Sequence, residues 1–208
     1  MTTKIYTKKG DKGVTNLYDS RGISKTDYIF EALGDLDELA SHIGHLCSII
    51  QTNPVLRFTK NNGEGFSVVA DKDTGMSLGN TENPIHKHLR WIQVCLLNIG
   101  SDMSTRDTSK HTTKDEDVAR LEEITDNYNE KCRRLTEFIL LGSGPSDSVA
   151  HICRSVARRA ERDMWRAEAY NAIPANCFQF MNRLSSFFFA LARYMAGDNE
   201  VTRSMYVK

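Results

Sequence analysis

The sequence predicts an all-helical protein, an antiparallel bundle of five helices that forms one domain over residues 1–208. In five segments, apolar residues recur at intervals of three and four, which is the period of an amphipathic helix. Outside the segment 52–83, no alternation of apolar and polar residues indicates a strand. Because helices with one apolar stripe bury it against each other, a bundle is the expected architecture.

A polar loop is expected to precede the first helix. Residues 1–26 contain Gly10, Gly13 and Gly22 among many Lys and Thr residues, a composition typical of loops. The helical period then predicts a helix over 27–51. Its expected core face is Phe30, Leu33, Leu36, Leu39, Ala40, Ile43, Leu46, Cys47 and Ile50, with Glu31, Asp35, Glu38, His42 and His45 on the opposite face.

The segment 52–83 interrupts the helical period and is predicted to be an insertion. It is rich in Asn, Gly and Asp, and the strings VLRFT and FSVVA flank NNGEG, which suggests a small β-hairpin. Prolines favour the first turn of a helix, and Pro84, Pro145 and Pro174 mark three further helix starts. The remaining helices are predicted over 84–104, 113–131, 146–169 and 174–197.

The composition excludes several classes of function. Lys plus Arg and Asp plus Glu each number 27, so we expect neither nucleic acid nor an anionic membrane as a partner. The five cysteines include no C-x-x-C pair, which argues against a disulfide framework and a zinc site. With no long apolar span and no secretory signal, the protein is expected in the cytoplasm, although a removed organelle presequence would leave no trace.

An arginine stripe is the first candidate for chemistry. Arg154, Arg158 and Arg162 are spaced by four residues and share one helix face with Glu161 and Trp165. Like charges at this spacing repel, so the stripe requires counter-charge. A phosphate site and a solvated or salt-bridged basic face explain it equally well. The opposite, apolar face is expected to hold Val149, Ile152, Cys153, Val156, Ala157, Ala160 and Met164.

Two further polar residues are predicted at the edges of core faces. Asp37 is expected on the apolar side of its helix, where a carboxylate needs a cationic partner, and Arg154 is the partner we choose. Asn182 falls in a stripe of the last helix that is otherwise apolar or small. It is either aimed at a ligand or a core amide bonded to backbone.

The N-terminal loop is the second candidate for chemistry. It combines Lys8, Lys9 and Lys25 with glycines and the hydroxyls of Thr7 and Thr15. Backbone N–H groups beside glycine can converge on an anion, and lysine adds positive charge. Neither G-x-x-x-x-G-K-[ST] nor G-x-G-x-x-G occurs in the chain. Loop and stripe together therefore indicate a polyphosphate site of another kind.

Three segments resemble the PduO-type ATP:cob(I)alamin adenosyltransferases. They are KIYTKKGDKGVTNL with the SKTD that follows, FEALGDLDELASHIG, and HICRSVARRAERDMW continuing to FMNRLSSFFFALARY. The resemblance implies a ferritin-like five-helix subunit in a homotrimer with active sites between subunits. It also implies transfer of the 5′-deoxyadenosyl group from ATP to Co(I) of cobalamin or a related corrinoid, giving adenosylcobalamin and triphosphate. Lys9 and Ser186 stand where the family usually has Thr and Asp.

The resemblance also implies roles for individual residues. Asp37 and Arg154 match the family's inter-subunit ion pair beside the corrinoid, and Phe138 matches the aromatic residue at the lower face of the corrin. Arg158 matches a residue of both the reaction and the ATP site. The positions that match binding of ATP, which enters with Mg²⁺, are Thr7, Lys8, Lys9, Gly10, Thr15, Lys25, Arg158, Arg159, Glu161, Arg162 and Asn182.

Alternatives remain open at this point. Phe138 is either this functional aromatic or a hydrophobic plug for the end of the bundle. The chain is either an enzyme or a non-catalytic protein that delivers a nucleotide or adenosylcobalamin. A bundle metal protein is less well supported, because no Glu-x-x-His motif accompanies Glu38, His42 and His45. A reductase and an adenosylcobalamin-dependent acceptor enzyme are the further partners that the enzyme would have.

Overall fold

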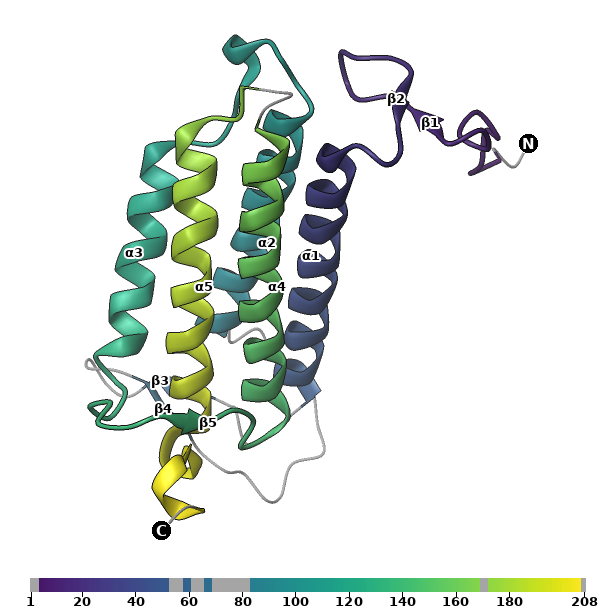
Figure 1. The fold of residues 1–208 in the computed structure, drawn as a ribbon. Coiled ribbons are helices and arrows are strands. Elements are labelled where there is room, and N and C mark those ends of the chain that lie inside the picture. The colour runs from purple at the N-terminus through teal and green to yellow at the C-terminus, as the bar shows by residue number, and fades with distance from the viewer. Residues whose placement is uncertain (1–3, 53–57, 61–65, 69–82, 169–171, 207–208) are drawn as a thin grey trace.

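The computed structural model describes residues 4–52, 58–60, 66–68, 83–168 and 172–206. Five long helices of this described part run side by side as one bundle, in alternating directions (Figure 1). Each predicted helix boundary lies within two residues of the observed one, so the all-helical antiparallel class is confirmed. The helices are α1 (Tyr28–Thr52), α2 (Pro84–Met103), α3 (Asp115–Asn129), α4 (Pro145–Ala167) and α5 (Ala175–Ala196).

Three short antiparallel ladders accompany the helices in the described residues. The strands β3 (Phe58–Lys60) and β4 (Phe66–Val68) pair with each other, which confirms a hairpin within 52–83; the rest of that insertion lies outside the described residues. The other two ladders were not predicted, because two-residue strands are too short to show alternation. They pair β1 (Val14–Thr15) with β2 (Ile23–Ser24), and β5 (Ile139–Leu140) with β6 (Val201–Thr202).

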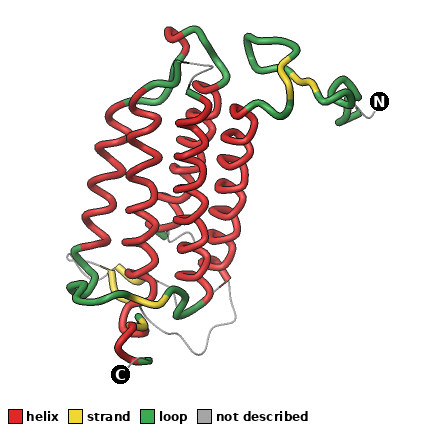
Figure 2. Tube along the Cα trace, viewed as in Figure 1, coloured by secondary structure: helices red, strands yellow, loops and turns green. Residues whose placement is uncertain are grey.

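Figure 2 shows where these ladders lie. The β1–β2 ladder belongs to residues 4–27, which we call the N-terminal arm, and the β5–β6 ladder lies at the opposite end of the bundle, where α4 begins. Three short 3-10 turns complete the described chain, at Thr108–Lys110, Gly197–Asn199 and Arg203–Met205. None of the described helices is long and apolar enough to cross a bilayer.

The core is built mainly around α4 and α5. On α5, Phe180, Phe187 and Phe188 are fully buried. The buried face of α4 consists largely of small residues such as Ala157 and Ala160, so neighbouring helices can approach it closely. Ile152 is 44% exposed, so its prediction as a core residue is wrong. It stands at one edge of the apolar stripe, beyond the reach of the neighbouring helices.

A buried carboxylate fixes the connection from α2 to α3. Asp102 is 1% exposed. Its Oδ1 accepts from the backbone N–H of Thr112 at 2.8 Å and from the Thr112 hydroxyl at 3.1 Å, and its Oδ2 accepts from the N–H of Thr113 at 2.9 Å. These bonds satisfy the N–H of Thr113, which would otherwise be buried unpaired, and tie the exposed Thr112 to the end of α2.

Replacing Asp102 by alanine should therefore destabilise the fold. Leaving a buried donor without an acceptor costs about 1–3 kcal/mol, so Asp102→Ala should lower the free energy of unfolding by about that amount in urea titrations. Asp107→Ala is the matched control, because Asp107 makes similar bonds to Ser109 on the exposed surface and its loss should matter far less. Equal losses in the two variants would contradict this account.

Candidate functional site

The N-terminal arm folds around a small cavity. The β1–β2 ladder brings Lys25 back over the start of the arm, where its N–H donates to the carbonyl of Gly13 at 2.9 Å. A Cβ added to Gly10 would lie 3.0 Å from Nζ of Lys25, so glycine leaves room for this close approach. A cavity of about 250 Å³ is lined by Thr7, Lys9, Gly10, Val14, Thr15 and Asn16.

Most of the arm residues predicted to bind ATP thus lie together. Thr7, Lys9, Gly10 and Thr15 line the cavity, and Lys25 borders it through Gly10. The side chain of Lys8 is exposed, and its backbone has a φ of +61°, a left-handed conformation that few residues with a side chain adopt. The arm therefore presents lysines, hydroxyls and a tight turn around one space, as an anion site requires.

The middle of the arm is anchored to the bundle, and the rest of the arm projects from it. Asp19 accepts from the N–H of Arg106 at 2.6 Å through Oδ2, and Leu17 is buried. This bond to the backbone of Arg106 holds the pKa of Asp19 below its usual value. Figure 1 shows the rest of the arm extending from the start of α1, away from the bundle. In the described residues, no hydrogen bond or ion pair joins the cavity residues to α4.

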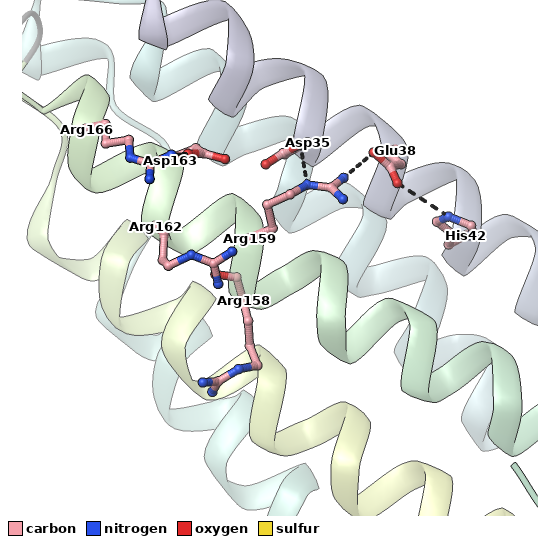
Figure 3. A network of polar contacts seen from close by, with 8 residues as sticks. All are labelled: Asp35, Glu38, His42, Arg158, Arg159, Arg162, Asp163 and Arg166. Carbon is pink, nitrogen blue, oxygen red and sulfur yellow. Dashed lines mark hydrogen bonds and ion pairs between the residues drawn. The ribbon is translucent and has the colours of Figure 1, made fainter. Parts of the chain in front are cut away.

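The arginines of α4 divide into two groups. Arg159 turns toward α1, where its Nε donates to Oδ1 of Asp35 at 2.9 Å and its Nη2 contacts Glu38 (Figure 3). The hydrogen bond with Asp35 raises the pKa of Arg159. Burial raises the pKa of Asp35, aided by nearby Asp163 and opposed by Arg159. Within the subunit, Arg159 therefore pins α4 to α1.

Arg158 and Arg162 point away from this cluster (Figure 3). Both side chains are exposed, and Nη1 of Arg162 donates to the backbone carbonyl of Arg158 at 2.9 Å. Neither has an ion pair among the described residues. Two unneutralised guanidinium groups one turn apart favour binding of an anion from outside the subunit.

The same surface continues onto α5 through Glu161. Its Oε1 accepts from Nδ2 of Asn182 at 3.0 Å, and Oδ1 of Asn182 accepts from Nη1 of Arg183 at 2.7 Å. Asn182 is exposed and its side chain bonds to these two side chains, so the alternative of a core amide bonded to backbone is wrong. The structure thus brings Arg158, Glu161, Arg162 and Asn182 onto one face.

The expected partnership of Asp37 with Arg154 is not formed within one subunit. Asp37 is exposed, so its prediction on the apolar side is wrong, and Asp35 takes the half-buried place beside α4. A helical wheel gives both flanks of an apolar stripe but not which flank meets the next helix. Arg154 is half-buried, and its buried Nε has no hydrogen-bond partner among the described residues.

Phe138 lies at the other end of the bundle, immediately before β5. Its side chain is 80% exposed, so the alternative of a hydrophobic plug is wrong within the subunit. The turn that follows is tightly fixed. Gly142 has a φ of +95°, and a Cβ there would lie 2.8 Å from Oγ of Ser148. Asp147 then accepts from the N–H groups of Ser143 and Gly144, both at 2.6 Å, and so caps α4.

Four features of this part of the structure were not predicted from the sequence. Asp35 and Glu38 were predicted only as surface carboxylates of their helix. Arg159, three to four residues from apolar residues of its own helix, carried a usable signal, because a cation at the flank of an apolar stripe indicates that a neighbouring helix pairs at that flank. Asn16, which lines the arm cavity, carried no signal of its own. The strand β6 was also missed, because its partner β5 lies more than 60 residues earlier in the chain.

Comparison with known proteins agrees with this geometry. A family model described as cobalamin adenosyltransferase matches residues 5–195. The corrinoid adenosyltransferase of Bos taurus is 34% identical over 99% of this chain and 76% of its own length, and that of Mycobacterium leprae is 33% identical over 96% of this chain and 94% of its own.

Solved structures with the same fold lead to the same family. A variant PduO-type ATP:corrinoid adenosyltransferase from Lactobacillus reuteri, complexed with cobalamin and ATP, has a TM-score of 0.73 and 30% identity, and covers 96% of each chain. Another variant of that enzyme, complexed with ATP, has a TM-score of 0.72 and 29% identity, and covers 92% of this chain and 93% of its own. By sequence along nearly its whole length and by fold, the chain belongs to the cobalamin adenosyltransferase family.

Proposed function

We propose that this chain transfers the 5′-deoxyadenosyl group of ATP to Co(I) of a corrinoid, in active sites formed between the subunits of a homotrimer. The proposal rests on the observation that the cationic residues suited to bind triphosphate form two separate surfaces. The arm cavity and the face of Arg158 and Arg162 are each cationic, and they lie apart within one subunit. A neighbouring subunit that brings its arm to this face would complete a triphosphate site.

The reaction requires binding and orientation rather than acid–base chemistry. Co(I) supplies the electron pair that forms the cobalt–carbon bond, and the C5′–O bond breaks with triphosphate leaving. Since Co(I) is itself a strong nucleophile, no general base is needed. The protein must hold C5′ in line with cobalt and stabilise the negative charge that grows on the leaving group.

The residues named for ATP fit this task. Lys25 and the arm cavity provide cations and N–H groups for the phosphates, and Arg158 and Arg162 add charge-assisted bonds. Mg²⁺ enters with ATP as part of the substrate, and Glu161 is a carboxylate of the kind that Mg²⁺ accepts. Lys8, Lys9, Arg159 and Asn182 extend the same two surfaces, with Arg159 acting mainly by holding α4 against α1.

The corrinoid is proposed to bind at the end of the bundle that carries Phe138. An exposed phenyl ring can occupy the lower face of cobalt, exclude water and the nucleotide base, and so make Co(II) easier to reduce. Arg154 has an unpartnered buried Nε, and Asp37 is an exposed carboxylate, which suits an ion pair formed only between subunits. The protein is proposed to work in the cytoplasm with a reductase and an acceptor enzyme.

A non-catalytic delivery protein is the second candidate, and one experiment separates the two. The protein is mixed anaerobically with ATP, Mg²⁺ and reduced hydroxocobalamin, and the visible spectrum is followed. An enzyme yields a light-sensitive cobalt–carbon product over many turnovers, whereas a delivery protein yields none. A metal protein is not favoured, since no three His, Cys, Asp or Glu side chains gather in the described part of the chain.

Removing Arg158 should weaken the use of ATP without unfolding the bundle. Loss of one charge-assisted contact to phosphate costs about 1.5–3 kcal/mol. Arg158→Ala should therefore raise the KM for ATP or lower kcat at least about tenfold, with an unchanged Tm. The matched control is Arg166→Ala, which removes an arginine of the same helix that already pairs with Asp163. A correctly folded Arg158→Ala variant with ordinary kinetics would exclude this residue from the site.

Removing the ring of Phe138 should slow adenosylation that starts from Co(II) more than adenosylation that starts from Co(I). If the ring covers the lower face of cobalt, Phe138→Ala should slow adenosylation from Co(II)alamin, supplied with a reductant, much more than from pre-formed Co(I)alamin. Since the ring is exposed, Tm should change little. Both rates and Tm are measured on one preparation, and equal losses in the two assays would refute the lower-face role.

A further inference from the structure

The C-terminal segment is bonded to the strand that carries Phe138. In the β5–β6 ladder, Thr202 lies opposite Ile139 and Val201 opposite Leu140. The N–H of Arg203 then donates to the carbonyl of Phe138 at 2.9 Å. The backbone from the Phe138 carbonyl through Leu140 is thus held by residues more than 60 positions later in the chain.

Glu137, the preceding residue, is held by the same segment. Its Oε2 accepts from the N–H of Ser204 at 2.9 Å, and its Oε1 accepts from the Ser204 hydroxyl at 2.7 Å. These bonds lower the pKa of Glu137, so the carboxylate is charged at neutral pH and both bonds are charge-assisted.

A buried ion pair fixes the start of the segment. Arg193 on α5 is 5% exposed, and its guanidinium binds both carboxylate oxygens of Glu200, at 2.6 and 3.2 Å. Its Nη2 also donates to the carbonyl of Arg133 at 2.7 Å. One side chain of α5 therefore ties down both the segment that starts at Glu200 and the chain that leads to Phe138.

Little besides this backbone can set the direction of the ring. The Phe138 side chain is 80% exposed, so packing inside the subunit holds it weakly. Exposure alternates along the strand, since Phe138 and Leu140 are exposed and Ile139 between them is half-buried. Because side chains alternate along an extended strand, a slip of one residue against β6 would turn the ring to the other face.

We propose that the segment Glu200–Ser204 positions Phe138 for the reaction, by fixing the strand whose register aims the ring at the lower face of the corrinoid. This inference rests on the proposed function. The segment lies beyond residues 5–195, the region that the family model matches. Its residues act through Phe138 and need not touch the substrate.

The test compares two substitutions at one position. Arg203→Pro removes the N–H that bonds to Phe138, and the extended conformation of Thr202, with φ of −111° and ψ of 158°, suits a following proline. Arg203→Ala removes the same side chain but keeps the N–H, and is the matched control. Each full-length variant is assayed from Co(II)alamin with a reductant and from pre-formed Co(I)alamin, with Mg²⁺ and ATP. The spectrum of four-coordinate Co(II)alamin is recorded before the reductant is added.

Arg203→Pro should slow the Co(II) route about tenfold or more and the Co(I) route less than about threefold, as small misplacements of a positioned group do. The four-coordinate Co(II) signal should fall in parallel, and Arg203→Ala should leave all three readouts unchanged. Should the proline variant fold poorly, Glu137→Ala removes the acceptor of both Ser204 bonds and should produce the same selective loss.

Phe138→Ala separates a failure of this inference from a failure of the proposed function. If Phe138→Ala is selective for the Co(II) route while the proline and Glu137 variants are not, the segment does not position the ring and the inference is overturned. If Phe138→Ala itself is not selective, the lower-face role fails, and the inference fails with it.

Discussion

The position of α4 between its neighbours is the constraint on which the rest of the structure depends. Its buried face is made of small residues, among them Ala150, Ala157 and Ala160, all without exposed surface. Burying a guanidinium in such a close contact without a partner would be costly, so the arginines of this helix lie on its remaining faces. The arginine surface is therefore a consequence of how the core is packed.

The pairing of α4 with α1 decides which arginine serves which purpose. Arg159 reaches two carboxylates of α1, of which Asp35 is half-buried, and removing the cation would leave that carboxylate without compensation. Arg158 immediately precedes it, about 100° around the helix, and faces outward. Adjacent residues of one sequence motif thus take different roles: Arg159 holds the helices together, and Arg158 carries a charge that no carboxylate pairs with in the part of the chain that the structure describes.

The helices could be predicted from the sequence, but several contacts between them could not. Apolar residues recur with a helical period in five segments, and this period predicted each helix boundary to within two residues. The choice of Asp37 over Asp35 failed because periodicity identifies an apolar face but not the neighbour on each flank. For the same reason, the sequence left open whether Asn182 is a core amide, and the structure shows it exposed and bonded to Glu161. The approach of Lys25 to Gly10 depends on a two-residue ladder that has no periodic signal, yet the residue types of the arm were enough to predict an anion site.

At each end of the bundle, an exposed residue lies beside a short β-ladder whose backbone hydrogen bonds hold it in place. A residue meant to contact a ligand between subunits must be exposed in its own subunit, so core packing cannot hold it in place. Lys25 follows β2, which pairs with the nearby β1, and Phe138 precedes β5, which pairs with the distant β6. Hydrogen bonds of the backbone fix the direction in which a side chain points without covering that side chain. Because these bonds are formed before the ligand binds, less conformational entropy is lost on binding. In the proposed site between subunits, the short ladders would therefore hold Lys25 and Phe138 in place while leaving their side chains exposed.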